Sequence, residues 1–158
     1  MIIWLASYPK SGNTWIRAII TSLIYSDDGI FNFDMLRKIS LFPKRSHFKD
    51  FIDDYSNLNK VSQYWISAQE KINSDDKIRI FKTHNGNYNF LGKDFTNKKN
   101  TLGVIYVVRD PRNIVASISN HYQINTEQSV NFLLDEKRFL FNKNDPNDLT
   151  EENIITLL

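Results

Sequence analysis

Blocks of apolar and polar residues follow one another along the chain, and the first blocks predict a strand, a tight loop and a helix. Residues 2–6 form an unbroken apolar run, which is typical of a strand buried on both faces of a parallel sheet. Apolar residues then recur at helical spacing over residues 15–24. The polar residues 10–13 separate the two segments, and Asn13 or Thr14 can cap the helix.

Two later segments also predict strands that end in polar residues. Residues 77–84 alternate between apolar and polar, end in Lys-Thr-His and precede an Asn-Gly turn. Residues 101–108 are the most strand-like part of the chain, and we expect them to form a central parallel strand. They lead through Pro111 into a helix over residues 112–122. Strands that alternate with helices in this way predict an α/β fold with a central parallel sheet.

Other periodic segments predict further helices, over residues 33–41, 60–73, 126–141 and 148–158. Thr126 is the expected cap of the third, and residues 93–100 are expected to form a polar loop. The last helix would carry an apolar seam of Ile154, Ile155, Leu157 and Leu158. Because such a seam gains free energy when it is buried, we expect it to pack on the sheet or to form a two-fold homodimer.

The irregular stretch between the predicted helices over residues 33–41 and 60–73 is rich in aromatic residues, namely Phe42, Phe48, Phe51 and Tyr55. These aromatic side chains suit a mobile segment that covers a cleft. They suit equally a local excursion whose rings pack into the core, and we favour this second interpretation.

Composition narrows the class of protein without deciding its function. The chain has 158 residues, of which 41% are hydrophobic and 24% charged, so we expect a single domain over residues 1–158. The formal net charge is +2, and Lys and Arg are scattered, so neither nucleic acid nor a membrane surface is implied as a partner. There is no Cys, and no apolar run approaches the ~18 residues of a membrane span. We therefore expect a cytoplasmic protein without disulfides.

The loop over residues 10–13 has the features of an anion site. A strand that runs through a short loop into a helix points backbone N–H groups and the positive end of the helix dipole at one position. Gly12 permits a close backbone approach, and Lys10 supplies an ammonium group. The Walker A pattern is excluded, because there the lysine follows the last glycine, whereas here Asn13 follows Gly12. The alternative interpretation is an ordinary polar turn.

The ends of the other two strands carry further candidate residues. Lys82 and His84 end one strand, and an imidazole at such a tip can accept a proton from a hydroxyl near neutral pH. We expect His47 and His121 to be structural instead.

Arg109 follows the other strand, and Ser117 lies on the helix after it. A guanidinium and a hydroxyl can meet one phosphate group there. The alternatives are an ion pair of Arg109 with Asp110 and an exposed helix position for Ser117.

Three motifs resemble those of the sulfotransferases that use 3′-phosphoadenosine 5′-phosphosulfate (PAPS). Residues 8–15, YPKSGNTW, resemble the loop that binds the 5′-phosphosulfate. Residues 82–84 match the Lys-x-His segment that carries the catalytic base. Residues 106–117 are similar to the segment that binds the 3′-phosphate, with its Arg and Ser at Arg109 and Ser117. The motifs occur in the order of the family.

The resemblance implies a P-loop-like three-layer α/β/α fold and transfer of a sulfuryl group from PAPS to a hydroxyl or amine. Adenosine 3′,5′-bisphosphate would be the other product, and no metal would be needed. By the resemblance, His84 is the base, and Lys10 and Lys82 stabilise developing charge. The implied donor-binding residues are Lys10, Ser11, Gly12, Asn13, Thr14, Trp15, Arg109 and Ser117, with Trp15 against the adenine.

The chain also departs from the family. It is about half the usual length and lacks the Arg-Lys-Gly segment that completes the 3′-phosphate site, so we expect a truncated domain. Two alternatives therefore stay open: a non-catalytic nucleotide-binding or assembly module, and a P-loop kinase or other NTPase. Asp110 is the only candidate for the acidic residue that an NTPase requires. The sequence leaves open whether the acceptor is a small molecule, a lipid or a carbohydrate.

Overall fold

A four-stranded sheet forms the centre of the protein. The computed structural model describes residues 1–55, 57–135, 139–140 and 156–157. The strands lie in the order β2-β3-β1-β6, and every neighbouring pair is parallel. Their bounds are β1 (Ile2–Ser7), β2 (Ser40–Leu41), β3 (Arg79–Thr83) and β6 (Thr101–Val107). This confirms the predicted α/β fold with a central parallel sheet.

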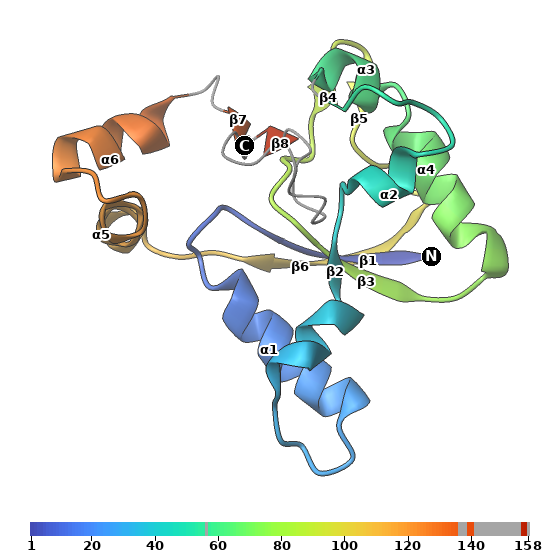
Figure 1. The fold of residues 1–158 in the computed structure, drawn as a ribbon, viewed down its shortest axis with the longest axis horizontal. Helices are drawn as coiled ribbons and strands as arrows, with labels where there is room; N and C mark the ends of the chain where they lie inside the picture. The colour runs from blue at the N-terminus through green and yellow to red at the C-terminus, as the bar shows by residue number, and fades with distance from the viewer. Residues whose placement is uncertain (56, 136–138, 141–155, 158) are drawn as a thin grey trace.

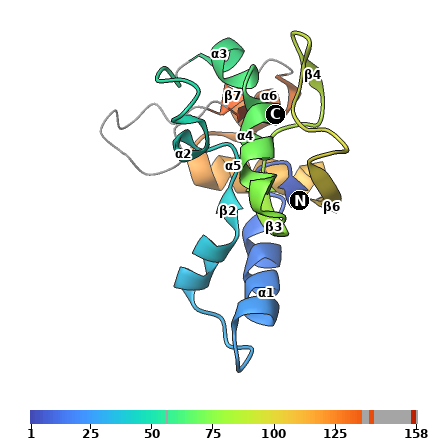
Figure 2. The ribbon, with the colours of Figure 1, turned by 90° about the vertical axis from the view of Figure 1, so that its right-hand side faces the viewer.

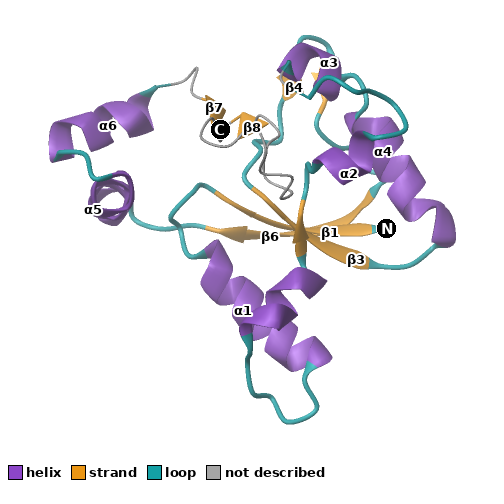
Figure 3. Cartoon of the chain, in the orientation of Figure 1, coloured by secondary structure: helices purple, strands orange, loops and turns teal. Residues whose placement is uncertain are grey.

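Helices cover both faces of the sheet, as Figures 1 and 3 show. On one face lie α1 (Asn13–Tyr25) and the 3₁₀ helix η1 (Phe33–Lys38). On the other lie α2 (Arg45–Phe48), α3 (Leu58–Ser62) and α4 (Trp65–Ile72), which continues into η2 (Asn73–Asp75). The helices α5 (Pro111–Tyr122) and α6 (Thr126–Leu134) lie beyond the carboxyl ends of the strands. A turn of the view by 90° separates α1 and η1 from the layer of α2 to α4 (Figure 2).

The main core lies between the sheet and the α2–α4 layer and is largely aromatic. Trp4 of β1 contacts the rings of Phe42, Phe81 and Phe95 at centroid distances of 5.4, 6.3 and 5.3 Å. Phe42 and Phe48 are fully buried. The aromatic stretch after β2 is therefore part of the core, as we favoured, and the alternative of a mobile cover over a cleft is wrong for these rings.

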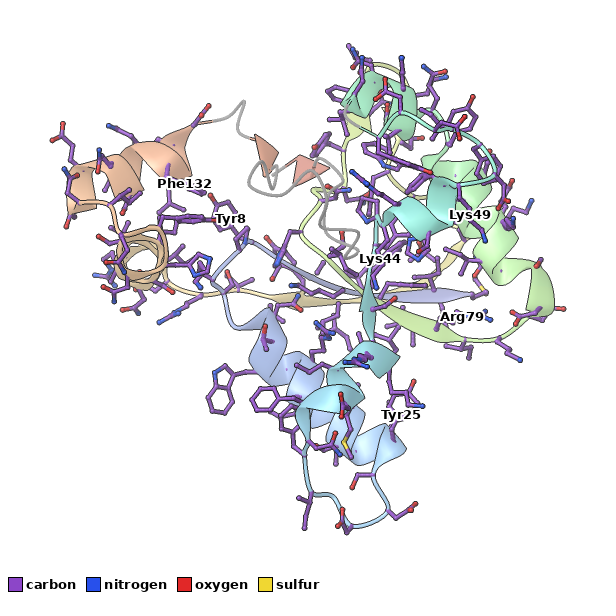
Figure 4. All side chains as sticks on the ribbon, viewed as in Figure 1. Tyr8, Tyr25, Lys44, Lys49, Arg79 and Phe132 are labelled. Atoms are coloured by element: carbon purple, nitrogen blue, oxygen red, sulfur yellow. The ribbon has the colours of Figure 1, made fainter. Side chains whose placement is uncertain are left out.

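A second, smaller core joins the α5–α6 pair to the loop after β1. It contains Ile114 and Ile118 of α5 and Phe132 of α6, and Tyr8 packs against it. Figure 4 shows the side chains of Tyr8 and Phe132 meeting between the loop and α6. The loop is thereby anchored on the side that faces α5.

Several element predictions are corrected by the structure. The segment 101–108 is parallel but not central, because β6 is the last strand of the sheet among the described residues. Exposed apolar residues lie on both of its faces, such as Val104 on one face and Ile105 on the other. The predicted helix 33–41 is instead η1 followed by the strand β2, and the predicted helix 60–73 is interrupted between α3 and α4.

The predictions for the second half of the chain need similar corrections. The loop predicted over 93–100 contains β5 (Lys93–Asp94), which pairs with β4 (Asn89–Phe90). The helix predicted over 126–141 ends at Leu134, and its cap is Asn125. Two short strands follow, β7 (Phe139–Leu140) and β8 (Thr156–Leu157), so the helix predicted over 148–158 is wrong at its end. The rest of that segment lies outside the described residues, and the dimer contact through it stays a prediction.

Candidate functional site

The loop between β1 and α1 is built around two left-handed backbone positions. Lys10 has φ 67° and Gly12 has φ 102°, and the N–H of Ser11 between them donates to the carbonyl of Tyr8 at 3.3 Å. Gly12 is itself the N-cap of α1, so the predicted cap by Asn13 or Thr14 is wrong. Within the described part of the chain no side chain caps this helix end. The first N–H groups of α1 are therefore left for a ligand.

Asn13 has a different task, which the sequence did not indicate. Its side chain is buried and donates from Nδ2 to the carbonyl of Leu5 at 3.0 Å and to Oγ of Ser7 at 3.1 Å. These two bonds tie the first turn of α1 back to the end of β1. They hold the loop in one conformation and replace the hydrogen bonds that both partners lose on leaving water.

His84 lies at the carboxyl end of β3, next to the end of β1. Its Nδ1 is 2.7 Å from the carbonyl oxygen of Ser7 and 3.3 Å from the Ser7 Oγ. Because a carbonyl oxygen can only accept, Nδ1 carries the ring proton and Nε2 is left as the basic nitrogen. The sequence contained no signal for this orienting role of Ser7, since the two residues are 77 positions apart.

The environment of His84 also sets its protonation state. Burial of the ring, followed by the positive charge of Lys82, lowers the pKa of His84 from 6.5 to about 4, although the bond to Ser7 opposes this shift. The imidazole is therefore neutral at physiological pH, and its Nε2 can accept a proton without first losing one. A bound anion beside Lys82 would raise the pKa of His84 toward neutrality.

Arg109 connects the end of β6 to the loop. Its Nη1 donates to the carbonyl oxygen of Lys10 at 3.0 Å. The alternative ion pair with Asp110 is not formed within the described structure; instead Asp110 pairs with Arg112 at 2.5 Å and caps α5 by accepting the Arg112 N–H at 2.9 Å. Because of Arg112, the pKa of Asp110 lies below its usual value.

The structure gathers nearly all the predicted site residues around one pocket of about 500 Å³. These lining residues are Lys10, Gly12, Asn13, Thr14, Trp15, Lys82, His84, Arg109 and Ser117. The exception is Ser11, which is buried and does not line the pocket. No acidic side chain is among the described residues that line it. The pocket therefore combines two ammonium groups, a guanidinium and helix N–H groups, which suits a ligand with several negative charges.

Three further residues line this pocket that were not among the predicted site residues: Pro9 of the loop, and His121 and Tyr122 of α5. His121 was expected to be structural, and its ring does contact that of Tyr122 at 4.7 Å. The signal that could have found it is its spacing, because His121 lies one helical turn after Ser117 and so on the same face of α5.

The described residues hold neither a cluster of metal ligands nor a membrane-spanning helix. No group of three or more potential His, Asp or Glu ligands is close enough to hold a metal ion in the part of the chain that the structure describes. Among the same residues, no helix has the length and apolar character needed to cross a membrane.

The fold and the pocket together define a protein that binds an anionic ligand at the carboxyl edge of a parallel α/β sheet. The sequence matches the family model of the sulfotransferase domain over residues 2–152. The chain therefore belongs to the sulfotransferase family, as its three motifs predicted. Comparison with curated protein sequences finds no match.

Proposed function

We propose that this sulfotransferase takes its sulfuryl group from PAPS and that His84 is the general base. The observation that carries the proposal is the pocket at the ends of β1, β3 and β6, where Lys10, Lys82 and Arg109 meet and where none of the described lining residues is acidic. PAPS carries phosphate groups at both ends of its ribose and a sulfate, and so requires such a concentration of positive charge.

The pocket residues divide between the two ends of the donor. Lys10 and the N–H groups at the start of α1 would hold the 5′-phosphosulfate and stabilise the charge that builds up on the leaving phosphate. Arg109 and Ser117 would hold the 3′-phosphate. Trp15 lines the pocket with 78% of its surface exposed, so its ring is available to stack on the adenine.

His84 would act on the acceptor. Its Nε2 accepts the proton of the acceptor hydroxyl while the oxygen forms a bond to sulfur, and the bond from sulfur to the 5′-phosphate oxygen breaks. The products are the sulfated acceptor and adenosine 3′,5′-bisphosphate. Lys82 would neutralise negative charge on the transferring group. We place the acceptor among small molecules, lipids or carbohydrates that carry a hydroxyl or an amine.

The two alternatives to this proposal are an NTPase and a non-catalytic binding module. An NTPase would need Asp110 for a metal ion, but this carboxylate is engaged by Arg112 and does not line the pocket. A non-catalytic binding module would use the same donor site without turnover.

Calorimetric titration with adenosine 3′,5′-bisphosphate and with ATP plus Mg²⁺ separates the donor classes. We expect binding of the bisphosphate in preference to ATP; the reverse preference would contradict the proposal. Turnover with PAPS and a panel of phenols, amines and sugars then separates an enzyme from a binding module.

The variant His84→Ala tests the base. It should lower turnover by ~10²–10⁴-fold and leave bisphosphate affinity nearly unchanged. Turnover like that of the wild-type protein would place the base elsewhere. Binding of the bisphosphate without turnover of any acceptor would favour the binding module.

A further inference from the structure

A short chain of hydrogen bonds runs from the loop after β1 to His84. The Nδ2 group of Asn13 donates to Oγ of Ser7 at 3.1 Å, and this Oγ lies 3.3 Å from Nδ1 of His84. The three residues come from three elements, because Asn13 begins α1, Ser7 ends β1 and His84 directly follows β3. The chain therefore joins the helix end that would hold the donor to the group that would act on the acceptor.

This chain of hydrogen bonds is largely shielded from water. Asn13 and Ser7 are each only 4% exposed, and His84 is half-buried. In such surroundings a hydrogen bond is stronger than in water, and neighbouring bonds of one network support each other. The orientation of each of the three groups is therefore set by the other two and not by solvent.

The direction of each hydrogen bond follows from its partners. The carbonyl oxygens of Leu5 and Ser7 can only accept, so Asn13 turns Nδ2 toward Leu5, and His84 turns its protonated Nδ1 toward Ser7. Asn13 also donates into one lone pair of the Ser7 hydroxyl, which has a second lone pair for the Nδ1 proton. The hydroxyl is thereby held in the orientation that accepts from His84, and Nε2 is kept as the basic nitrogen.

The position of Asn13 costs free energy that packing does not return. Its Oδ1 is buried and has no hydrogen-bond partner within the described part of the chain. An acceptor that leaves water without gaining a partner is unfavourable. Such unsatisfied groups occur in native structures where a functional requirement outweighs stability. The benefit of asparagine at this position therefore lies in the two bonds that it donates, one of which serves Ser7.

We propose that Asn13 and Ser7 are positioning residues for the base: their side chains hold His84 in the tautomer and orientation that proton abstraction requires. Asn13 lines the pocket together with His84, and its backbone N–H is among the first of α1. Binding of the donor and orientation of the base then depend on the same residue. This inference rests on the proposed function, because it assigns a role in the same reaction.

¹⁵N NMR of the unliganded protein tests the inference without turnover. The two ring nitrogens of a neutral histidine are distinct in its two tautomers, and His84→Gln identifies the signals of this residue. We expect the Nδ1–H tautomer to predominate in the wild-type protein. Ser7→Ala keeps the backbone carbonyl but removes the hydroxyl, and it should raise the share of the Nε2–H tautomer about fivefold, as for one lost hydrogen bond. Asn13→Ala should raise this share as well, because the Ser7 hydroxyl can then turn its proton toward Nδ1.

Kinetics with PAPS measure the effect on the reaction. Ser7→Ala and Asn13→Ala should each lower kcat about three- to tenfold, because the ring is held less firmly. The affinity for adenosine 3′,5′-bisphosphate should change less than about twofold, since both variants keep the backbone N–H groups of the loop. Ser7→Thr keeps a hydroxyl and should retain the tautomer share and most of kcat.

The matched control is Asn100→Ala. Asn100 is also buried, at 2% exposed, and its Oδ1 accepts from Asn73 at 3.0 Å, but it does not line the pocket. The control therefore removes a buried asparagine with a hydrogen bond and should leave the tautomer share of His84 and kcat close to the wild-type values.

Any of three results would overturn the inference. An unchanged tautomer share in Ser7→Ala and Asn13→Ala would show that the carbonyl of Ser7 alone orients the ring. An equal loss of kcat in Asn100→Ala and Asn13→Ala would show a general effect of stability. Ser7→Thr behaving like Ser7→Ala would show that the hydroxyl is not responsible. Failure of the proposed function is seen separately, as absence of bisphosphate binding or turnover, whereas the NMR measurement needs neither.

Discussion

At the scale of single residues, Arg109 links the two ends of the proposed donor site. Its Nη1 donates to the Lys10 carbonyl at 3.0 Å, so its guanidinium supports the loop after β1, and Arg109 also lines the pocket. A planar group with five N–H donors can serve both tasks, whereas a lysine could not.

Replacement of Arg109 by Ala should therefore discriminate between nucleotides. We expect adenosine 3′,5′-bisphosphate to lose ~1.5–3 kcal/mol of binding free energy, as for a lost charge-assisted hydrogen bond, and adenosine 5′-monophosphate to lose much less. Titration of both nucleotides measures the difference. Arg112→Ala is the control, because Arg112 pairs with Asp110 and does not line the pocket. Equal losses for the two nucleotides would remove Arg109 from the 3′-phosphate site.

The individual contacts of the site also show what the sequence could not predict. The motif residues of the loop were predictable, because strand, loop and helix are adjacent in sequence and their chemistry is local. The carbonyl of Ser7 that orients His84 could not be predicted, because every residue has a backbone carbonyl and the residue type does not indicate which one accepts a hydrogen bond. The burial of Asn13 was missed for a related reason, since its partners include the Leu5 carbonyl.

At the scale of elements, the turn into α1 requires glycine at position 12 because of its backbone conformation and not because a side chain would lack room there. A Cβ added at Gly12 would meet no atom within 4 Å, yet the φ of +102° is one that residues with side chains rarely adopt. Lys10 accepts a comparable conformation two residues earlier, at φ 67°. Strain in this loop is therefore conformational, and a glycine at position 12 limits it.

The substitution Gly12→Ala should lower the free energy of unfolding by ~1–2 kcal/mol and weaken bisphosphate binding, because the loop can relax only by moving its N–H groups. Chemical denaturation and calorimetry measure the two effects. Gly103→Ala in β6 is matched to it, since a Cβ there also meets nothing within 4 Å but the φ is not left-handed. A similar loss in both variants would contradict the conformational explanation.

Some elements could be predicted from the sequence, and others could not, for a physical reason. β1 and α5 have clear periodicity or a clear start signal, and the structure has them where expected. β2 is only two residues long, too short for any alternation, and it is a strand only because β3 lies beside it. The position of β6 at the edge depends in the same way on which strands pair across long distances.

At the scale of the whole molecule, the lowered pKa of His84 makes the free energy of unfolding depend on pH. As the pH falls, His84 binds a proton around pH 4 in the folded protein, whereas in the unfolded chain it binds one already around pH 6.5. Between these values the unfolded state holds more protons, so the stability that His84 contributes is present above pH 6.5 and is lost as the pH falls toward 4.

We therefore expect the wild-type protein to lose about 3 kcal/mol more unfolding free energy than His84→Gln between pH 7 and pH 4. Denaturant titrations of both proteins at a series of pH values measure this difference. Because the variant keeps every other titrating group, the comparison isolates the imidazole. Parallel curves for the two proteins would show that the pKa of His84 is close to its ordinary value.

The placement of β1 between β3 and β6 has a consequence for how the protein acquires its structure. The groups that complete the site meet across long stretches of chain, 77 residues for Ser7 and His84 and 99 for Lys10 and Arg109. Closing such long loops costs entropy before any contact repays it, and parallel pairing of distant segments is slow. During synthesis the loop after β1 emerges well before Arg109, which lies 99 residues further along the chain than Lys10. Acquisition of nucleotide binding should therefore be one of the last events of folding.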